Sequence, residues 1–127
     1  MKPYRVLVTG SRTWDDITTI GAAIEQAVID AAGRPVLVVH GACPGGADWH
    51  ADHYARWMRG KGCAVDVEQH PANWTLNGKR AGFIRNALMV NLGADVCLAF
   101  IKDGSRGASH TAALAEQAGI TVRRWTA

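Results

Sequence analysis

Apolar and polar positions follow two different periods along this chain, and the periods alternate. Short apolar runs rich in β-branched residues predict five strands, at 4–8, 36–40, 64–69, 95–100 and 120–125. Apolar residues spaced three and four apart predict helices from Asp15 or Asp16 to about residue 31, and over 47–58, 78–91 and 108–117. The run 36–40 is almost continuously apolar, which is typical of a strand buried on both faces.

This alternation of strands and helices predicts an α/β fold, because parallel strands need crossover helices that cover both faces of the sheet. We expect a Rossmann-like three-layer α/β/α sandwich with a mostly parallel five-stranded sheet, formed as a single domain over residues 1–127. In such sheets a ligand lies outside the carboxyl ends of the strands, near the point where the strand order reverses. The turns that follow the predicted strands are therefore the place to look for a site.

Composition narrows the class of protein further. The formal charge of +3 comes from dispersed basic residues without a Lys/Arg run, so a nucleic-acid-binding tail is not indicated. No apolar stretch approaches the roughly 20 residues of a membrane-spanning helix, and the first residues lead into a strand without a signal-peptide pattern. Three cysteines cannot all pair. We expect a cytoplasmic protein with no membrane partner.

Glycine-rich turns, most of them carrying a basic residue, follow the predicted strands. Glycine permits close backbone approach to a ligand, and a helix N-terminus offers free N–H groups and partial positive charge, so these turns suit phosphate. The ligand-binding residues predicted in the turns are Gly10, Ser11, Arg12, Gly41, Gly45, Gly46, Asp48, Gly104, Ser105, Arg106 and Gly107. Two such turns, after strands one and four, are expected to share one phosphorylated ligand if these strands are neighbours.

Several residues in or near these turns have two possible roles. Asp48 either caps the helix that it begins or contacts the ligand, as a ribose hydrogen-bond partner or a general base. Arg80 either faces a phosphate or lies on a solvated helix face. Cys43 either fills the turn or serves as a nucleophile, the second only with a stabilised thiolate. Trp74 ends the irregular segment 70–74 and is the candidate for stacking on a base.

A set of ordered motifs resembles one known family. They are Val8-Thr9-Gly10-Ser11-Arg12, His40-Gly41-Ala42-Cys43-Pro44-Gly45-Gly46-Ala47-Asp48, His70-Pro71-Ala72-Asn73-Trp74, Arg85-Asn86-x-x-Met89-Val90, and Ala94 to Phe100 followed by Gly104-Ser105-Arg106-Gly107. Together they resemble the YspA, cpYpsA-related branch of the SLOG superfamily, found in bacteria and phages. The resemblance implies a Rossmannoid domain that binds a nucleotide or nucleotide-derived ligand, ADP-ribose-like, NAD-like or a nucleoside phosphate, and it adds Arg85 and Asn86 to the predicted site.

The resemblance carries binding over better than catalysis. Hydrolase members of the superfamily use a glutamate in a P-G-G-x-G-T-x-x-E turn, and no glutamate stands at the corresponding place after Gly107. The chain also has Asn73 and Ala108 where the branch is expected to have aspartate and threonine. The catalytic residues are therefore unknown, and binding or sensing is the first hypothesis. The alternatives are a phosphoribohydrolase-like N-glycosidase that recruits Asp48 or Glu116, and a single-stranded DNA-binding protein.

No cofactor is required by these motifs beyond the nucleotide-type ligand, and no metal site is expected. His40, His50, His53 and His70 invite a metal interpretation, but His50-x-x-His53 lacks the glutamate of an H-E-x-x-H motif. The partners expected are a small-molecule nucleotide and a second copy of the chain, in a homodimer or higher homo-oligomer, with nucleic acid disfavoured. An apolar helix face with Leu88, Val90 and Leu92 is the candidate interface.

Overall fold

The computed structural model describes residues 2–127 and contains a sheet of five parallel strands. The strands are β1 (Tyr4–Gly10), β2 (Val36–His40), β3 (Val65–Gln69), β4 (Val96–Ile101) and β5 (Thr121–Thr126). They lie in the order β3-β2-β1-β4-β5, and each adjacent pair is parallel. The predicted Rossmann-like α/β architecture is confirmed, and the sheet is parallel throughout.

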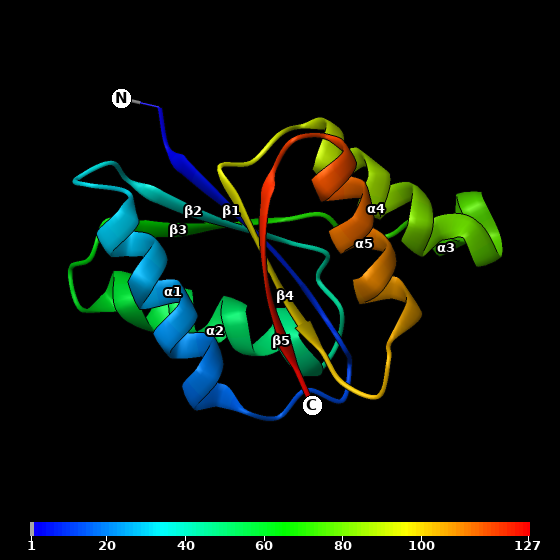
Figure 1. The fold of residues 1–127 in the computed structure, drawn as a ribbon, viewed down its shortest axis with the longest axis horizontal. Helices are drawn as coiled ribbons and strands as arrows, with labels where there is room; N and C mark the ends of the chain where they lie inside the picture. Colours follow the sequence, from blue (N-terminus) through cyan, green and yellow to red (C-terminus); the bar gives the residue numbers. More distant parts are fainter. Residues whose placement is uncertain (1) are drawn as a thin grey trace.

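Helices cover both faces of this sheet (Figure 1). They are α1 (Ile17–Asp30), α2 (Gly46–Gly60), α3 (Trp74–Asn77), the 3₁₀ turn η1 (Gly78–Arg80), α4 (Ala81–Asn91) and α5 (Arg106–Gln117). Helix α1 packs beside α2 on one face, and α4 packs beside α5 on the other. None of the helices in residues 2–127 has the length and apolar character needed to cross a bilayer.

The period of the strands explains the three layers. Successive strand residues point to opposite faces, so Val6 and Val8 of β1 join the core beneath α1 and α2, whereas Leu7 joins the core beneath α4 and α5. All six residues of β4 are buried, as expected for a central strand covered on both faces. Two apolar cores thus hold one sheet, and they leave its carboxyl-terminal edge open to carry polar groups.

Local signals set the helix boundaries, with one departure from the predicted elements. Asp16 begins α1, because its Oδ1 accepts a hydrogen bond from the Thr19 N–H at 3.1 Å. The helical segment predicted over 78–91 is present as η1 and α4, but the turn of helix before it was not predicted: Asn73 caps the short helix α3 by accepting from the Leu76 N–H, and Gly78, at φ +57°, separates α3 from α4. The irregular link after β3 is therefore shorter than predicted, and Trp74 stands on a helix.

The strand order reverses between β1 and β4. From β1 the chain proceeds to β2 and β3 on one side, and β4 and β5 lie on the other side. The two central strands are linked at their carboxyl ends, where the Ser11 N–H donates to the Phe100 carbonyl at 2.9 Å. The neighbouring position of strands one and four, on which a shared site depends, is thereby confirmed.

Candidate functional site

A cavity of about 410 Å³ lies at the carboxyl ends of β1 and β4, where the strand order reverses. The end of β1 and the following turn 11–13 form one wall, and the first turn of α5 forms another. Residues of α3, η1 and α4 line the opposite side, and Cys43 and Asp48 line the base from the segment after β2. The cavity volume falls within the range of about 300–1,000 Å³ that small-molecule sites occupy.

Most of the residues predicted from the sequence line this cavity. They are Gly10, Ser11, Arg12, Asp48, Trp74, Arg85, Asn86, Ser105 and Gly107. The predicted residues outside the lining are Gly41, Gly45, Gly46, Arg80, Gly104 and Arg106. Arg80 and Arg106 are exposed and adjoin lining residues in the chain, whereas Gly41 and Gly46 are buried. Contact of any of these residues with a ligand stays a prediction.

The basic side chains divide into two groups according to their partners. Ion pairs with carboxylates engage Arg5, Arg34, Arg56, Arg59, Lys102, Arg123 and Arg124. Within residues 2–127, the basic side chains with no carboxylate oxygen inside 4.0 Å are Lys2, Arg12, Lys61, Lys79, Arg80, Arg85 and Arg106. Arg12, Lys79 and Arg85 of this second group line the cavity. Three of the seven side chains of this second group thus line the cavity, and within residues 2–127 Asp48 is the carboxylate that lines it with them.

Backbone donors without acceptors add to this positive potential. In the described part of the chain, the N–H groups of Arg12 and Thr13 have no hydrogen-bond acceptor, and both residues line the cavity. The first N–H groups of a helix have no intrahelical partner, and Ser105 makes no side-chain cap at the start of α5. Gly107 and Ala108 of that first turn line the same cavity. Two sets of free amides therefore flank one space.

The Ser11 hydroxyl is already engaged within the protein. Its Oγ accepts a hydrogen bond from the Lys102 N–H at 2.7 Å and donates to the Lys102 carbonyl at 3.1 Å. A serine hydroxyl has one proton to donate, so that proton is not free for a phosphate oxygen. Ser11 thus ties the end of β1 to the residue that follows β4, and it fixes the turn that carries Arg12.

Asp48 stands in the first turn of α2, but its carboxylate does not cap that helix. Gly45 is the N-cap residue, and Asp48 Oδ2 instead lies 3.1 Å from the Gly41 nitrogen and 3.4 Å from the Cys43 nitrogen. The carboxylate therefore occupies a small backbone nest made by the segment 41–43. Burial raises the pKa of Asp48 above its usual range. The capping interpretation of Asp48 is wrong in this form, and its contact with a ligand stays a prediction.

Arg85 is a buried cation that holds several segments at once. Its Nη1 donates to the carbonyls of Gly41 and, at 3.3 Å, His70, while its Nε donates to Asn86 Oδ1 at 2.7 Å. Its Nη2 lies 3.8 Å from Cys43 Sγ. The guanidinium is thus fixed by neutral groups while its charge stays uncompensated at the cavity wall. Such a group attracts an anion without having to move.

Two of the predicted glycines are required by contacts inside the protein. A Cβ on Gly46, which has φ +68°, would lie 2.3 Å from the Ser11 carbonyl oxygen, and a Cβ on Gly10 would lie 2.3 Å from the Ala47 Cβ. These glycines let the start of α2 pack directly against the turn after β1. Their role in close packing is plain from the geometry, and the sequence-based expectation that they admit a ligand stays untested.

The side of the cavity formed by α3 and α4 contains apolar residues next to Arg85 and Asn86. Trp74, Phe83 and Met89 line it, and Trp74 is 53% exposed. The nearest atom to a Cβ built on Gly82 is the Trp74 ring, at 3.7 Å, so the indole lies over the start of α4. Aromatic rings and the Arg85 guanidinium thus line one side of the cavity, and Arg12 lies on the wall formed by the turn after β1.

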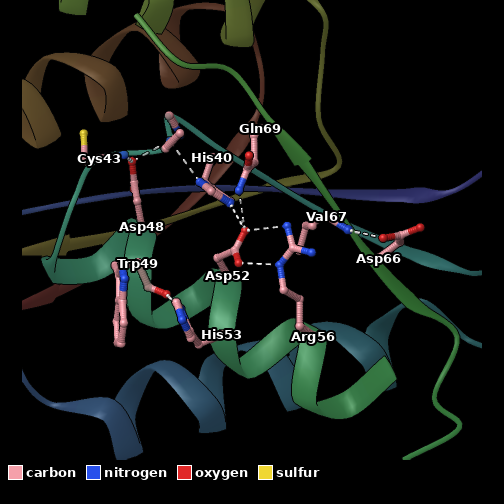
Figure 2. A network of polar contacts seen from close by, with 12 residues as sticks. His40, Cys43, Asp48, Trp49, Asp52, His53, Arg56, Asp66, Val67 and Gln69 are labelled. Carbon is pink, nitrogen blue, oxygen red and sulfur yellow. Dashed lines mark hydrogen bonds and ion pairs between the residues drawn. The ribbon is translucent and has the colours of Figure 1, made fainter. Parts of the chain in front are cut away.

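A buried polar network supports the segment behind the cavity (Figure 2). His40 Nε2 lies 2.7 Å from Asp52 Oδ2, and Asp52 also accepts from Arg56 and Gln69. Burial by itself would raise the pKa of Asp52, but the hydrogen bonds from Arg56, Gln69 and His40 lower it to about 2. In residues 2–127 no group of three metal-ligating side chains converges. His53 instead stacks on Trp49, with ring centroids 3.6 Å apart.

The residues proposed for hydrolysis have other partners. Glu116 forms an ion pair with Arg124 and lies outside the cavity lining. Burial and the adjacent Asp48 raise the pKa of the Cys43 thiol, which disfavours the thiolate needed for a nucleophile. Asp48 is in the lining, but its Oδ2 is held by two amides.

Sequence reasoning did not select several lining residues, namely Thr9, Thr13, Lys79, Phe83, Met89 and Lys102. Lys102 could have been selected from the sequence, because it directly follows the buried strand β4. The carboxyl end of β4 lies beside that of β1, where a site is expected. Phe83 and Met89 could not have been selected, since their spacing on a helix is equally typical of core positions.

The chain is similar to a known protein family. The family model described as YspA, cpYpsA-related SLOG family matches residues 4–76. The Gene 61 protein of Mycobacterium phage D29 is 46% identical over 118 residues, which cover 93% of each chain. No solved structure matches.

Proposed function

Because the chain belongs to the YspA, cpYpsA-related SLOG family, we propose that it binds a nucleotide-derived ligand in the cavity at the ends of β1 and β4. The observation that carries the proposal is the gathering of unpaired cations there, with Arg12, Lys79 and Arg85 in the lining and Arg80 and Arg106 beside it. Isolated positive charges repel one another, so their concentration at one place is compensated by a bound anion.

We assign the parts of the ligand from the residues that line the cavity. The phosphate lies between the free amides of Arg12 and Thr13 and the first turn of α5, within reach of the Arg12 guanidinium. The base lies against Trp74 and Phe83. A volume of about 410 Å³ is near the lower end of the range for small-molecule sites, which favours a mononucleotide over a dinucleotide.

We propose binding or sensing rather than turnover. The single lining carboxylate, Asp48, is fixed to the backbone of 41–43, and the glutamate of the hydrolase relatives has no counterpart here. The three cysteines are unpaired, which fits a reducing compartment such as the cytoplasm. A binding role leaves the ligand chemically unchanged, and this separates it from an N-glycosidase.

The first prediction concerns the phosphate contact. With a panel of AMP, ADP-ribose, NAD and cyclic dinucleotides, we expect AMP-like ligands to raise the melting temperature of the protein. Arg12→Ala is expected to weaken binding by roughly tenfold or more, because a charge-assisted hydrogen bond contributes about 1.5–3 kcal/mol. Thermal shift and calorimetric titration measure the effect, and chromatography of the recovered ligand shows whether it is intact.

Lys61→Ala is the matched control for this experiment. Lys61 is also a cation without a carboxylate partner, but it lies past the end of α2 near the Trp57 ring. The control should bind with unchanged affinity. Equal losses of affinity in both variants would indicate a nonspecific charge effect and contradict the assigned site. Release of free base from the ligand would show that the protein hydrolyses it, contrary to the proposed binding role.

We further propose that two copies of the chain associate through α3 and α4. Large apolar side chains exposed on this segment are Trp74, Leu76, Phe83, Ile84, Leu88 and Leu92, whereas Val90 of the expected interface is buried and faces the core. Such a concentration of exposed apolar surface is typical of an interaction site.

The second prediction tests this association. Sedimentation or light scattering should give the mass of two chains, and Leu88→Glu should reduce it to one, because a buried unpaired carboxylate strongly disfavours the interface. AMP binding should persist in this variant, since Leu88 does not line the cavity. A wild-type mass of one chain throughout the micromolar range would contradict the proposal.

A further inference from the structure

His40 belongs to the buried polar network behind the cavity and contacts the segment 41–43. His40 ends β2 and is only 1% exposed, and its two ring nitrogens face different partners (Figure 2). Nε2 faces the Asp52 carboxylate at 2.7 Å. Nδ1 accepts a hydrogen bond from the Ala42 N–H at 3.0 Å. His40 does not itself line the cavity.

These partners define the protonation of the ring. A nitrogen that accepts from an N–H group carries no proton, so Nδ1 is bare. Nε2 then carries the single proton and donates it to Asp52, whose carboxylate is an acceptor. Asp52 is itself held by Arg56 at 2.6 Å and by Gln69 at 3.0 Å. The structure therefore contains neutral His40 in one tautomer, held in one ring orientation.

The segment that His40 contacts is unusual and forms part of the site. Ala42 has φ +56°, a left-handed conformation that is unfavourable for a non-glycine residue. The amides on both sides of it, Gly41 and Cys43, donate to Asp48, and the Gly41 carbonyl accepts from Arg85. The three consecutive N–H groups of the segment 41–43 thus donate to two side chains. Asp48 accepts from the outer two, and His40 accepts from the middle one.

We propose that His40 is a positioning residue for the ligand cavity: its bare Nδ1 holds Ala42 and thereby places Cys43, Asp48 and Arg85 for binding. Protonation of the ring puts a second N–H where the Ala42 N–H points, so the two hydrogens oppose each other and the segment 41–43 is released. Ligand binding is then lost at acidic pH. This inference rests on the proposed nucleotide site for its last step only.

The charged and polar groups around the His40 ring come from α2, α4 and β3. Asp48 and Asp52 come from α2, with Arg56 behind Asp52, and Arg85 comes from α4 by way of Gly41. From the end of β3, Gln69 meets Asp52, and the His70 N–H donates to the His40 carbonyl. The His70 ring points elsewhere, to Glu68 at 2.7 Å.

Two amide variants separate the roles of the two nitrogens. The amide oxygen of His40→Asn replaces Nδ1 as an acceptor for Ala42, whereas the amide nitrogen of His40→Gln replaces Nε2 as a donor to Asp52. We expect His40→Asn to retain slow exchange of the Ala42 amide hydrogen, and His40→Gln to speed that exchange by roughly tenfold or more, the effect of one lost buried hydrogen bond. His70→Gln, in the other histidine–carboxylate pair, should leave the exchange unchanged.

The pH profile of AMP binding provides the second readout. As the pH is lowered, wild-type protein should lose affinity relative to His40→Asn, and the ratio of the two dissociation constants cancels protonation of the AMP phosphate itself. His40→Gln should bind AMP roughly tenfold more weakly at pH 7.

The outcomes distinguish this inference from the proposed function. Absence of binding of every nucleotide of the panel to wild-type protein would refute the function, yet the Ala42 exchange rates would still decide the role of His40. Equal exchange in the Asn and Gln variants, or an Nδ1–H tautomer in the nitrogen NMR spectrum of the wild-type ring, would overturn the positioning role. The spectrum of the wild-type ring decides even if a variant does not fold.

Discussion

Arg85→Ala is expected to lower the free energy of unfolding by about 3 kcal/mol, which for a domain of this size lowers the melting temperature by roughly 10 °C. The guanidinium donates to the Gly41 and His70 carbonyls and to Asn86, and the side chain is only 9% exposed. Truncation leaves buried acceptors without donors and opens a void between segments. Urea denaturation followed by circular dichroism measures the loss.

Two comparisons make this prediction specific. Arg80→Ala removes an exposed cation near the same cavity and should change stability by less than about 0.5 kcal/mol. Arg85→Lys keeps the charge but cannot reach all acceptors, so it should fall between alanine and wild type. If Arg85→Ala were no less stable than Arg80→Ala, the contacts from Arg85 to the segment 41–43 would not organise the site.

Gly46→Ala is expected to cost more than about 3 kcal/mol. The residue has φ +68°, where a Cβ is strained, and that Cβ would lie 2.3 Å from the Ser11 oxygen and 2.4 Å from the Arg12 Cα. Both are backbone atoms, so no side chain can rotate away. The start of α2 must move from the turn that forms the cavity wall, and AMP binding should weaken together with stability. Thermal unfolding and calorimetric titration record the two effects.

Gly60→Ala is the matched control within the same helix. A Cβ on Gly60 meets no atom within 4 Å, and its φ is not positive. Alanine there should stabilise the protein by about 0.5–1 kcal/mol, because it restricts the unfolded chain and favours helix. Comparable stability for the two variants would contradict the close packing of α2 on the turn after β1.

The fold could be predicted from the sequence because its signals are local. The continuous apolar run of β2 and the complete burial of β4 reflect central strands of a parallel sheet, and the alternation with helices leaves few topologies. The short helix α3 was missed because its four residues, 74–77, are too few to show a helical period. At Gly78 the positive φ ends one helix, and the next begins at Ala81.

The candidate site was only partly predictable. The turns after β1 and β4 could be placed together, since the carboxyl ends of neighbouring parallel strands share one edge. The sequence does not say which basic side chains lack an acidic partner. Arg56 pairs with a carboxylate on its own helix and Arg124 with one on α5, whereas Arg12 has no such partner. The glycines of 41–46 suggested a ligand cradle, but Asp48 fills the nest of 41–43 from inside the protein.

The most direct test of the account is a titration with AMP monitored by the amide spectrum of nitrogen-labelled protein. We predict saturable shifts of the Arg12, Thr13, Gly107 and Ala108 amides, which surround the proposed phosphate position, and of the Trp74 indole. The amides of β5 at Thr121 and Val122, at the opposite end of the sheet, should not move. Shifts confined to other surfaces, or none with any nucleotide of the panel, would contradict a nucleotide site between β1 and α5.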